Sequence, residues 1–115
     1  MKLISLKTLC ELVGVSRRSI QCYEKAGLMR STSKNKYGHL LYDVETLHRA
    51  EEIKFLQQLG FKLREIREII DAPCNVKKEV LKRRVSELEE ESAKQDKIIQ
   101  EAMEYIKGLE REILG

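Results

Sequence analysis

The C-terminal part of the chain carries an apolar repeat that a compact domain of this size cannot bury. Residues recur there in alternating steps of four and three over several heptads, with charged residues between them. A helix over residues 77–114 would be about 57 Å long at 1.5 Å per residue. The preceding residues are too few to cover it, so the pattern predicts a coiled coil with a second copy of the chain, that is, a homodimer. The predicted dimerisation positions are Leu81, Val85, Leu88, Ser92, Gln95, Ile99, Ala102, Ile106, Leu109 and Ile113.

The polar positions of this repeat, Ser92 and Gln95, fall near the midpoint of the predicted helix. In an antiparallel pair the two midpoints meet, and these side chains would help to fix the register. A parallel pair would align them as well, so the repeat alone leaves the orientation open.

The formal charge of the chain is uneven along its length. The whole chain has a net charge of +3, but Lys and Arg far outnumber Asp and Glu within residues 1–42, where the acids are Glu11 and Glu24. Residues 71–115 carry slightly more acids than bases. The basic part is therefore the part expected to meet a polyanion, although a merely solvated lysine-rich face would look the same in composition.

Two short helices with a glycine-containing turn are predicted in the basic part. Ser5 can cap a helix that ends at Gly14, and Ser16 can cap a second helix that runs to about Ala26, with Gly27 behind it. Two such helices in succession form the helix-turn-helix pattern.

A small hairpin and two more helices follow. Residues 29–42 lack helical periodicity and have polar turn residues between apolar ends, which predicts a β wing. Asp43 can cap a third helix that stops at Gly60, and a shorter fourth helix closes before Pro73. The predicted fold is mainly α: a winged helix-turn-helix head of four helices and a small β wing (1–72), a linker (73–76) and one dimerisation helix (77–114).

Several segments in this order resemble the MerR family of bacterial transcription regulators. They are "GVSRRSIQCYEKAGLM", "YGHLLYDVETLHRAEEIKFLQQLGFKLREIREII", which contains the typical LGF-x-L-x-EI run, and the coiled-coil tail. The resemblance implies an antiparallel homodimer whose second helices enter the major groove of double-stranded DNA while the wings touch the neighbouring backbone. It also implies an inverted-repeat operator within a promoter, a distorted promoter spacer and RNA polymerase as a partner.

The basic head and the resemblance together predict a set of DNA-contacting residues. Arg17 and Arg18 open the second helix, where arginine side chains reach guanine edges, unless both are merely solvated. Tyr23 matches a family tyrosine that contacts the backbone, and half-burial against the first helix is the alternative for it. The full set is Ser16, Arg17, Arg18, Gln21, Tyr23, Arg30, Lys34, Lys36, His39, Tyr42, Arg49 and Lys62.

The chain departs from the family pattern at two sites. Gln21-Cys22-Tyr23 stands where the family has Arg-Tyr-Tyr or Arg-Phe-Tyr, and Gly38-His39-Leu40 stands where it favours Gly-Tyr-Arg. Two phosphate-binding arginines are thus missing. Basic residues of the wing and third helix are the candidates to replace them, as is Lys62, which stands where the family often has a serine cap.

The three cysteines do not form a disulfide framework. Cys10 is expected in the core, and Cys22 is expected to serve packing or specificity rather than redox chemistry. Cys74 precedes the predicted dimerisation helix, whose positive end would favour its thiolate form, so it is a possible redox residue. His39 and His48 lack ligand spacing, and we expect no metal site and no cofactor.

Other classes of protein fit the sequence less well. There is no phosphate-binding glycine loop and no nucleophile with a nearby histidine, so an enzyme is not expected. A coiled-coil interaction protein with a weak or non-specific DNA-binding head is the main alternative, and a thiol-responsive regulator acting through Cys74 is another. No signal peptide or apolar span is predicted, which favours the cytoplasm. The effector is unknown, and the chain is either a short member of the family or part of a longer protein.

Overall fold

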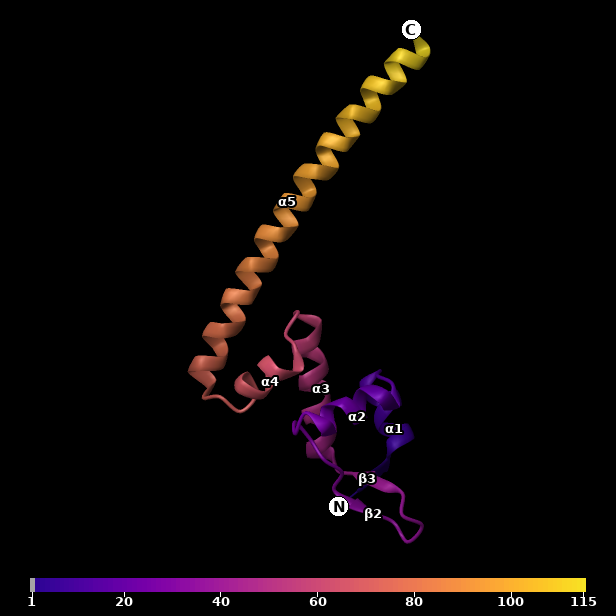
Figure 1. The fold of residues 1–115 in the computed structure, drawn as a ribbon, viewed down its shortest axis with the longest axis vertical. Helices are drawn as coiled ribbons and strands as arrows, with labels where there is room; N and C mark the ends of the chain where they lie inside the picture. Colours follow the sequence, from indigo (N-terminus) through magenta and orange to yellow (C-terminus); the bar gives the residue numbers. More distant parts are fainter. Residues whose placement is uncertain (1) are drawn as a thin grey trace. The chain divides into compact units, whose positions relative to one another are not determined.

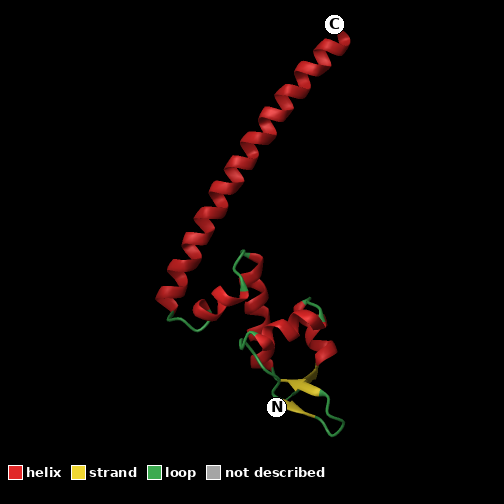
Figure 2. Ribbon diagram, in the orientation of Figure 1, coloured by secondary structure: helices red, strands yellow, loops and turns green. Residues whose placement is uncertain are grey.

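The computed structural model describes residues 2–115 as two compact units, one up to Lys77 and one from Lys78 onward. The first unit is the head. It contains the strands β1 (Ile4–Ser5), β2 (Ser33–Lys34) and β3 (Leu40–Tyr42), and the helices α1 (Leu6–Val13), α2 (Arg17–Lys25), α3 (Val44–Gln58) and α4 (Leu63–Ile69). The second unit consists of the rest of α5 (Cys74–Leu114). Figure 1 labels these elements and Figure 2 separates helices from strands.

The predicted caps explain where α1, α2 and α3 begin. The Ser5 hydroxyl accepts a hydrogen bond from the Thr8 N–H at 3.2 Å, and Ser16 does the same for the Ser19 N–H at 3.1 Å. Asp43 accepts from the Thr46 N–H at 2.8 Å, and this bond holds the pKa of Asp43 below its usual range. Each bond satisfies a backbone donor that the helix itself leaves unpaired.

The wing is the outer part of a three-stranded antiparallel sheet with the order β1-β3-β2. The hairpin is the one that the sequence predicts; within it Ser33 pairs with Leu41, and Ile4 of β1 pairs with Tyr42. The extra strand β1 comes from the chain start, which the sequence pattern did not reveal. It ties the base of the wing to the residue that caps α1.

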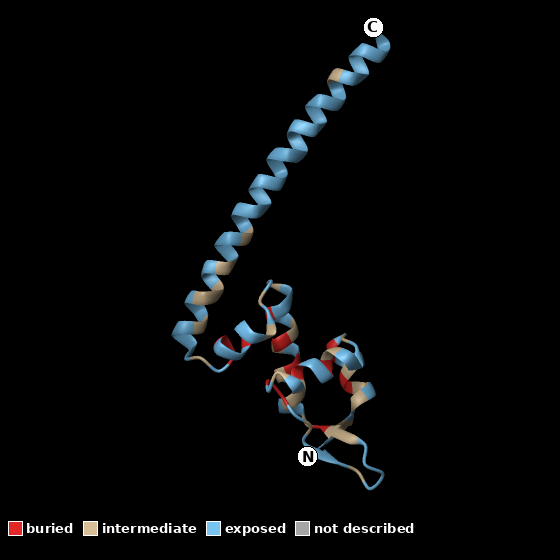
Figure 3. Ribbon diagram, viewed as in Figure 1, coloured by how far each residue is buried: buried red, intermediate tan, exposed pale blue. Residues whose placement is uncertain are grey.

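The core lies entirely within the head. Apolar side chains from all four of its helices are buried there, together with Tyr42 at the end of the wing, whereas α5 contains no buried residue (Figure 3). The core residues are Leu9, Val13, Ile20, Tyr23, Leu28, Met29, Tyr42, Ala50, Ile53, Leu56, Ile66, Ile69 and Ile70.

The long helix begins earlier than the heptad pattern alone indicated. The Lys77 N–H donates to the Pro73 carbonyl at 3.0 Å, which closes the first turn directly after the proline. Residues 74–76 of the predicted linker are therefore helical, because proline is well suited to the start of a helix and not to its interior. Among residues 2–115, no helix is both long and apolar enough to cross a bilayer.

Candidate nucleic-acid interface

The helix α2 has one buried and one exposed side. Ile20 and Tyr23 point into the core, while Arg17, Arg18 and Gln21 are exposed. The Ser16 cap fixes the start of the helix, so the two arginines occupy its first turn. Exposed residues in the first turn of the second helix are the ones that reach base edges in helix-turn-helix proteins.

The first turns of α1 and α2 carry the wrong charge for helix stability. The positive end of a helix dipole favours acids, and α3 and α4 follow this rule with Glu45 and Glu65. Neither α1 nor α2 has an acid in its first turn, and α2 begins with two arginines. A local rule broken without a compensating contact in the fold is expected at functional sites.

In the described part of the chain these arginines also have no carboxylate partner. Within residues 2–115, the ion pairs of the structure join residues from His48 onward, and no carboxylate pairs with Arg17 or Arg18. The cations of α2 are therefore available to an external anion.

The tip of the wing is a fixed turn with an exposed aromatic ring. The Asn35 carboxamide oxygen accepts from the Tyr37 N–H at 2.9 Å and from the His39 N–H at 3.0 Å. Tyr37 is 72% exposed, and the Lys36 ammonium lies 5.1 Å from the centre of its ring. Sequence reasoning did not single out Tyr37, although an aromatic residue between a lysine and a turn glycine was the available signal.

Two tyrosines that were predicted to contact DNA are buried in the core. Tyr23 is 1% exposed and its hydroxyl donates to Gln57 Oε1 at 2.7 Å; Tyr42 is 0% exposed and donates to Glu24 Oε1 at 2.7 Å. Burial raises the pKa of both hydroxyls, and for Tyr42 the bond to Glu24 raises it further. Tyr42 cannot reach a nucleic acid from this position, and the burial alternative is the one that fits Tyr23. We leave both out of the proposed contact set.

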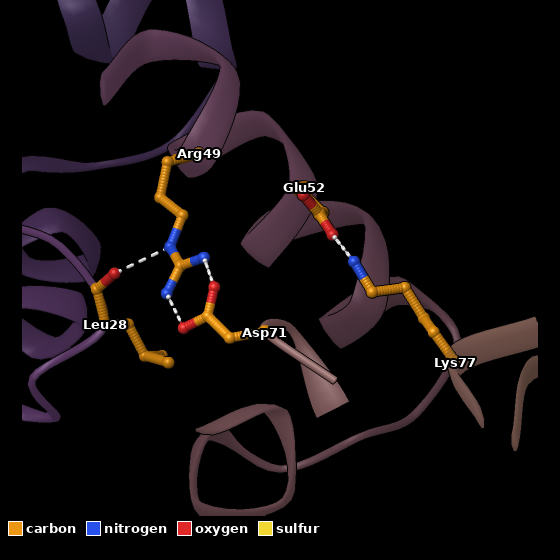
Figure 4. A network of polar contacts seen from close by, with 5 residues as sticks. All are labelled: Leu28, Arg49, Glu52, Asp71 and Lys77. Carbon is orange, nitrogen blue, oxygen red and sulfur yellow. Dashed lines mark hydrogen bonds and ion pairs between the residues drawn. The ribbon is translucent and has the colours of Figure 1, made fainter. Parts of the chain in front are cut away.

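Arg49, another predicted contact, joins three parts of the head instead. Its Nε donates to the Leu28 carbonyl at 2.8 Å, and its two terminal nitrogens donate to Asp71 at 2.6 and 2.9 Å (Figure 4). The same figure shows Lys77, in the first turns of α5, paired with Glu52 of α3 at 2.7 Å. A bidentate guanidinium pair holds a fixed geometry, so Arg49 is a structural residue here.

The ion pair of Arg49 should make stability sensitive to acid. Hydrogen bonds from Arg49 hold the pKa of Asp71 below its usual value, so this stabilisation is present above about pH 3.9 and is lost as the pH falls through the lowered pKa. Asp71 is mostly exposed, so Asp71→Asn should cost at most about 1 kcal/mol at neutral pH. Urea unfolding of both proteins from pH 7 to pH 2 should show the difference vanishing in acid. A difference that persists at pH 2 would contradict this account.

The remaining predicted residues are exposed at several places on the head. Arg30, Lys34, Lys36 and His39 lie in or next to the wing. Lys62 is the residue directly before α4, which follows the end of α3 that lies away from the wing (Figure 1). Its backbone N–H is capped by Glu65 at 2.9 Å, and its ammonium makes no ion pair within the described chain.

The cysteines do not assemble into a site. Cys10 is partly buried, and this burial raises its pKa, while Cys22 and Cys74 are exposed. Cys74 is the first residue of α5. Across residues 2–115 no cluster of three or more histidine, cysteine or acidic side chains could hold a metal ion.

A winged helix-turn-helix head with unpaired arginines at the start of α2 defines a class of nucleic-acid-binding protein. The chain matches the family model described as "MerR HTH family regulatory protein" over residues 4–73 and that described as "MerR, DNA binding" over residues 47–104. The chain therefore belongs to the MerR family of transcription regulators.

Individual relatives agree with this assignment. The HTH-type transcriptional activator mta of Bacillus subtilis (strain 168) is 30% identical over 95 residues, which are 83% of this chain and 37% of that protein. The nodulation protein NolA of Bradyrhizobium sp. (strain NC92) is 40% identical over 58 residues, which are 50% of this chain and 24% of the relative. The chain thus spans well under half the length of both relatives.

Solved structures show the same fold. MtaN, the N-terminal part of the Bacillus subtilis multidrug transporter activator, has a TM-score of 0.70 at 30% identity, covering 84% of this chain and 92% of that one. HiNmlR, a MerR family regulator lacking the sensor domain and bound to promoter DNA, has a TM-score of 0.70 at 16% identity, covering 86% and 80%. The second likeness supports the fold alone.

Proposed function

We propose that this protein is a sequence-specific transcription regulator that binds an inverted-repeat operator as a homodimer and distorts the promoter spacer. The observation that carries the proposal is the first turn of α2, where two unpaired arginines stand on the exposed side of a capped helix. Arg18 is the proposed base reader, and Arg17 is available to the backbone beside it. Gln21 follows one turn later on the same helix and is exposed.

The homodimer is proposed because α5 carries an apolar heptad seam, and none of its described residues is buried. Ile99 is 53% exposed and Ile106 is 51% exposed, although both are heptad positions. A second copy of α5 would cover them, and an antiparallel arrangement is the one that the family resemblance implies. Two heads then face two half-sites, which is why an inverted repeat is expected.

The proposal is tested by selecting DNA with the purified full chain. Random and bacterial genomic duplexes are incubated with the protein at near-physiological salt, and the retained duplexes are sequenced. Enrichment of one inverted repeat within promoter spacers supports the proposal, and the spacing of its half-sites reports the dimer. Retention without sequence preference, or no retention, would contradict it.

The base-reading role of Arg18 gives a specific expectation. Arg18→Ala should weaken binding to the selected operator by about 1–3 kcal/mol and relax the preference at one base pair of each half-site. The measurement is a competition titration with operators changed at single positions. Arg111→Ala, which removes the same charge from the last turn of α5, is the matched control. Equal weakening on every sequence would mean that Arg18 binds phosphate instead of a base.

One observation favours a second candidate function, the coiled-coil interaction protein. Ile98, Met103 and Tyr105 flank the heptad seam, and all three are exposed. An apolar protein interface would show a shallow dependence of affinity on salt, whereas phosphate contacts give a steep one. A salt titration of the selected complex separates the two.

A further inference from the structure

A groove lies between the wing and the starts of α1 and α2. Lys7 and Arg17 line it from the two helices, and Asn35 and His39 line it from the wing. The residues come from separate parts of the sequence, and the antiparallel pairing of β1 with β3 brings the start of α1 next to the wing.

The charged groups of this groove are all cationic. None of its lining residues is acidic, whereas three other hollows of the surface each include a carboxylate, from Asp43 and Glu45, from Glu24, or from Glu68. Within the described chain no carboxylate pairs with Lys7 or Arg17. An anion in this groove would therefore meet two unneutralised charges.

Lys7 has no evident role in the stability of the fold. It stands in the first turn of α1, where the helix dipole opposes a positive charge, and its ammonium group makes no hydrogen bond within residues 2–115. Its position is explained if the side chain binds a negatively charged group that comes from outside the chain.

The wing adds a neutral donor to the same groove. Two backbone N–H groups converge on one atom of the Asn35 carboxamide, so that atom must be the oxygen. The amide nitrogen is left with two N–H donors and without a partner in the described residues. The groove thus combines cations with an oriented amide, which is the chemistry that binds phosphate oxygens.

We propose that this groove binds one phosphate of the DNA backbone, held by Lys7 and Arg17 from the helices and by the Asn35 amide from the wing. The inference rests on the proposed DNA-binding function and adds Lys7 to its contact set. Arg17 lines the groove, and Arg18 is the next residue in the first turn of α2. If Arg18 contacts a base, the DNA backbone beside that base should therefore lie in the groove.

The test compares Lys7→Ala with Lys94→Ala, which removes the same charge from an exposed position on α5. Dissociation constants are measured on the selected operator and on an unrelated duplex between 50 and 200 mM salt. Loss of one phosphate contact should make the slope of log K against log salt shallower by about 0.9. The wild type should bind more tightly than Lys7→Ala, and the ratio of their dissociation constants should fall about 3.5-fold when the salt concentration rises fourfold. This fall should be the same on both duplexes.

A second readout locates the phosphate. When single phosphates of the operator are ethylated, the wild type should be inhibited at one position per half-site, and Lys7→Ala should be inhibited less strongly at that position, because Arg17 and Asn35 still contact the phosphate. Thermal melting of Lys7→Ala should match the wild type or exceed it, since a cation at the helix start is removed.

The outcomes distinguish failure of the groove proposal from failure of the proposed DNA-binding function. If the wild type binds the operator and Lys7→Ala behaves as Lys94→Ala does in slope and ethylation pattern, the groove proposal is wrong and the regulator proposal stands. If the wild type binds no DNA at all, both are wrong.

Discussion

Replacing Ile99 and Ile106 by lysine should convert the proposed dimer to a monomer of 13.4 kDa and abolish binding to the selected operator at concentrations where the wild type is saturated. Both are heptad positions on the exposed seam of α5. In the dimer each lysine would bring an unpaired charge into an apolar interface, which is strongly unfavourable. In a dimer, binding of one head holds the second head at a high effective concentration near the other half-site. A monomer lacks this effect, so its affinity for the operator should be lower by about 10²–10⁴.

Sedimentation equilibrium measures the mass, and a titration of the operator measures the affinity. Gln100→Lys is the matched control, because it adds a lysine to α5 outside the heptad seam and should leave the dimer intact. The core lies wholly in the head, so the lysine variant should keep its head folded even as α5 loses helicity. A double variant that still sediments as a dimer would show that the seam is not the interface.

Tyr23→Ala should destabilise the head by about 3–5 kcal/mol, as large-to-small changes of buried aromatic residues do. Tyr23 anchors α2 against the rest of the head, with its ring in the core and its hydroxyl on Gln57 of α3. Because domains of this size are stable by only about 5–15 kcal/mol, this cost is a large fraction of the free energy of unfolding. Chemical denaturation followed by far-UV circular dichroism gives the free energy of unfolding.

Tyr23→Phe distinguishes this structural role from a role in DNA binding. It removes only the hydrogen bond to Gln57, at about 0.5–1.5 kcal/mol, and should leave operator affinity unchanged under conditions where the protein is folded. If Tyr23→Phe instead weakens DNA binding as strongly as Arg18→Ala does, the hydroxyl contacts the backbone and the assignment to the core is wrong.

Local signals were sufficient to predict most of the secondary structure. A serine or an aspartate caps each of α1, α2 and α3 within three residues of its own position, and such bonds depend only on neighbouring sequence. Apolar residues of α3 also recur at helical spacing, and Ala50, Ile53 and Leu56 among them are buried.

The candidate site was harder to predict. Contacts between residues far apart in the sequence decide which of the predicted residues lie in the core and which lie on the surface. Tyr23 and Gln57 are 34 positions apart, Tyr42 and Glu24 are 18 apart, and Arg49 and Asp71 are 22 apart. A tyrosine or an arginine can serve either the surface or the core, and only the tertiary partner decides between them. Lys7 was missed for the same reason, since the strand pairing that places it beside the wing is not visible in the pattern of the chain.

The unpaired cations of the head also have a kinetic consequence. Attraction to the phosphate backbone acts before any base is read, so the first encounter with a duplex should be fast and should slow as ionic strength rises. Because this attraction does not depend on sequence, a protein held by it can slide along the duplex between encounters. Arg17, Lys7 and the lysines of the wing would then shorten the search for an operator that other residues recognise.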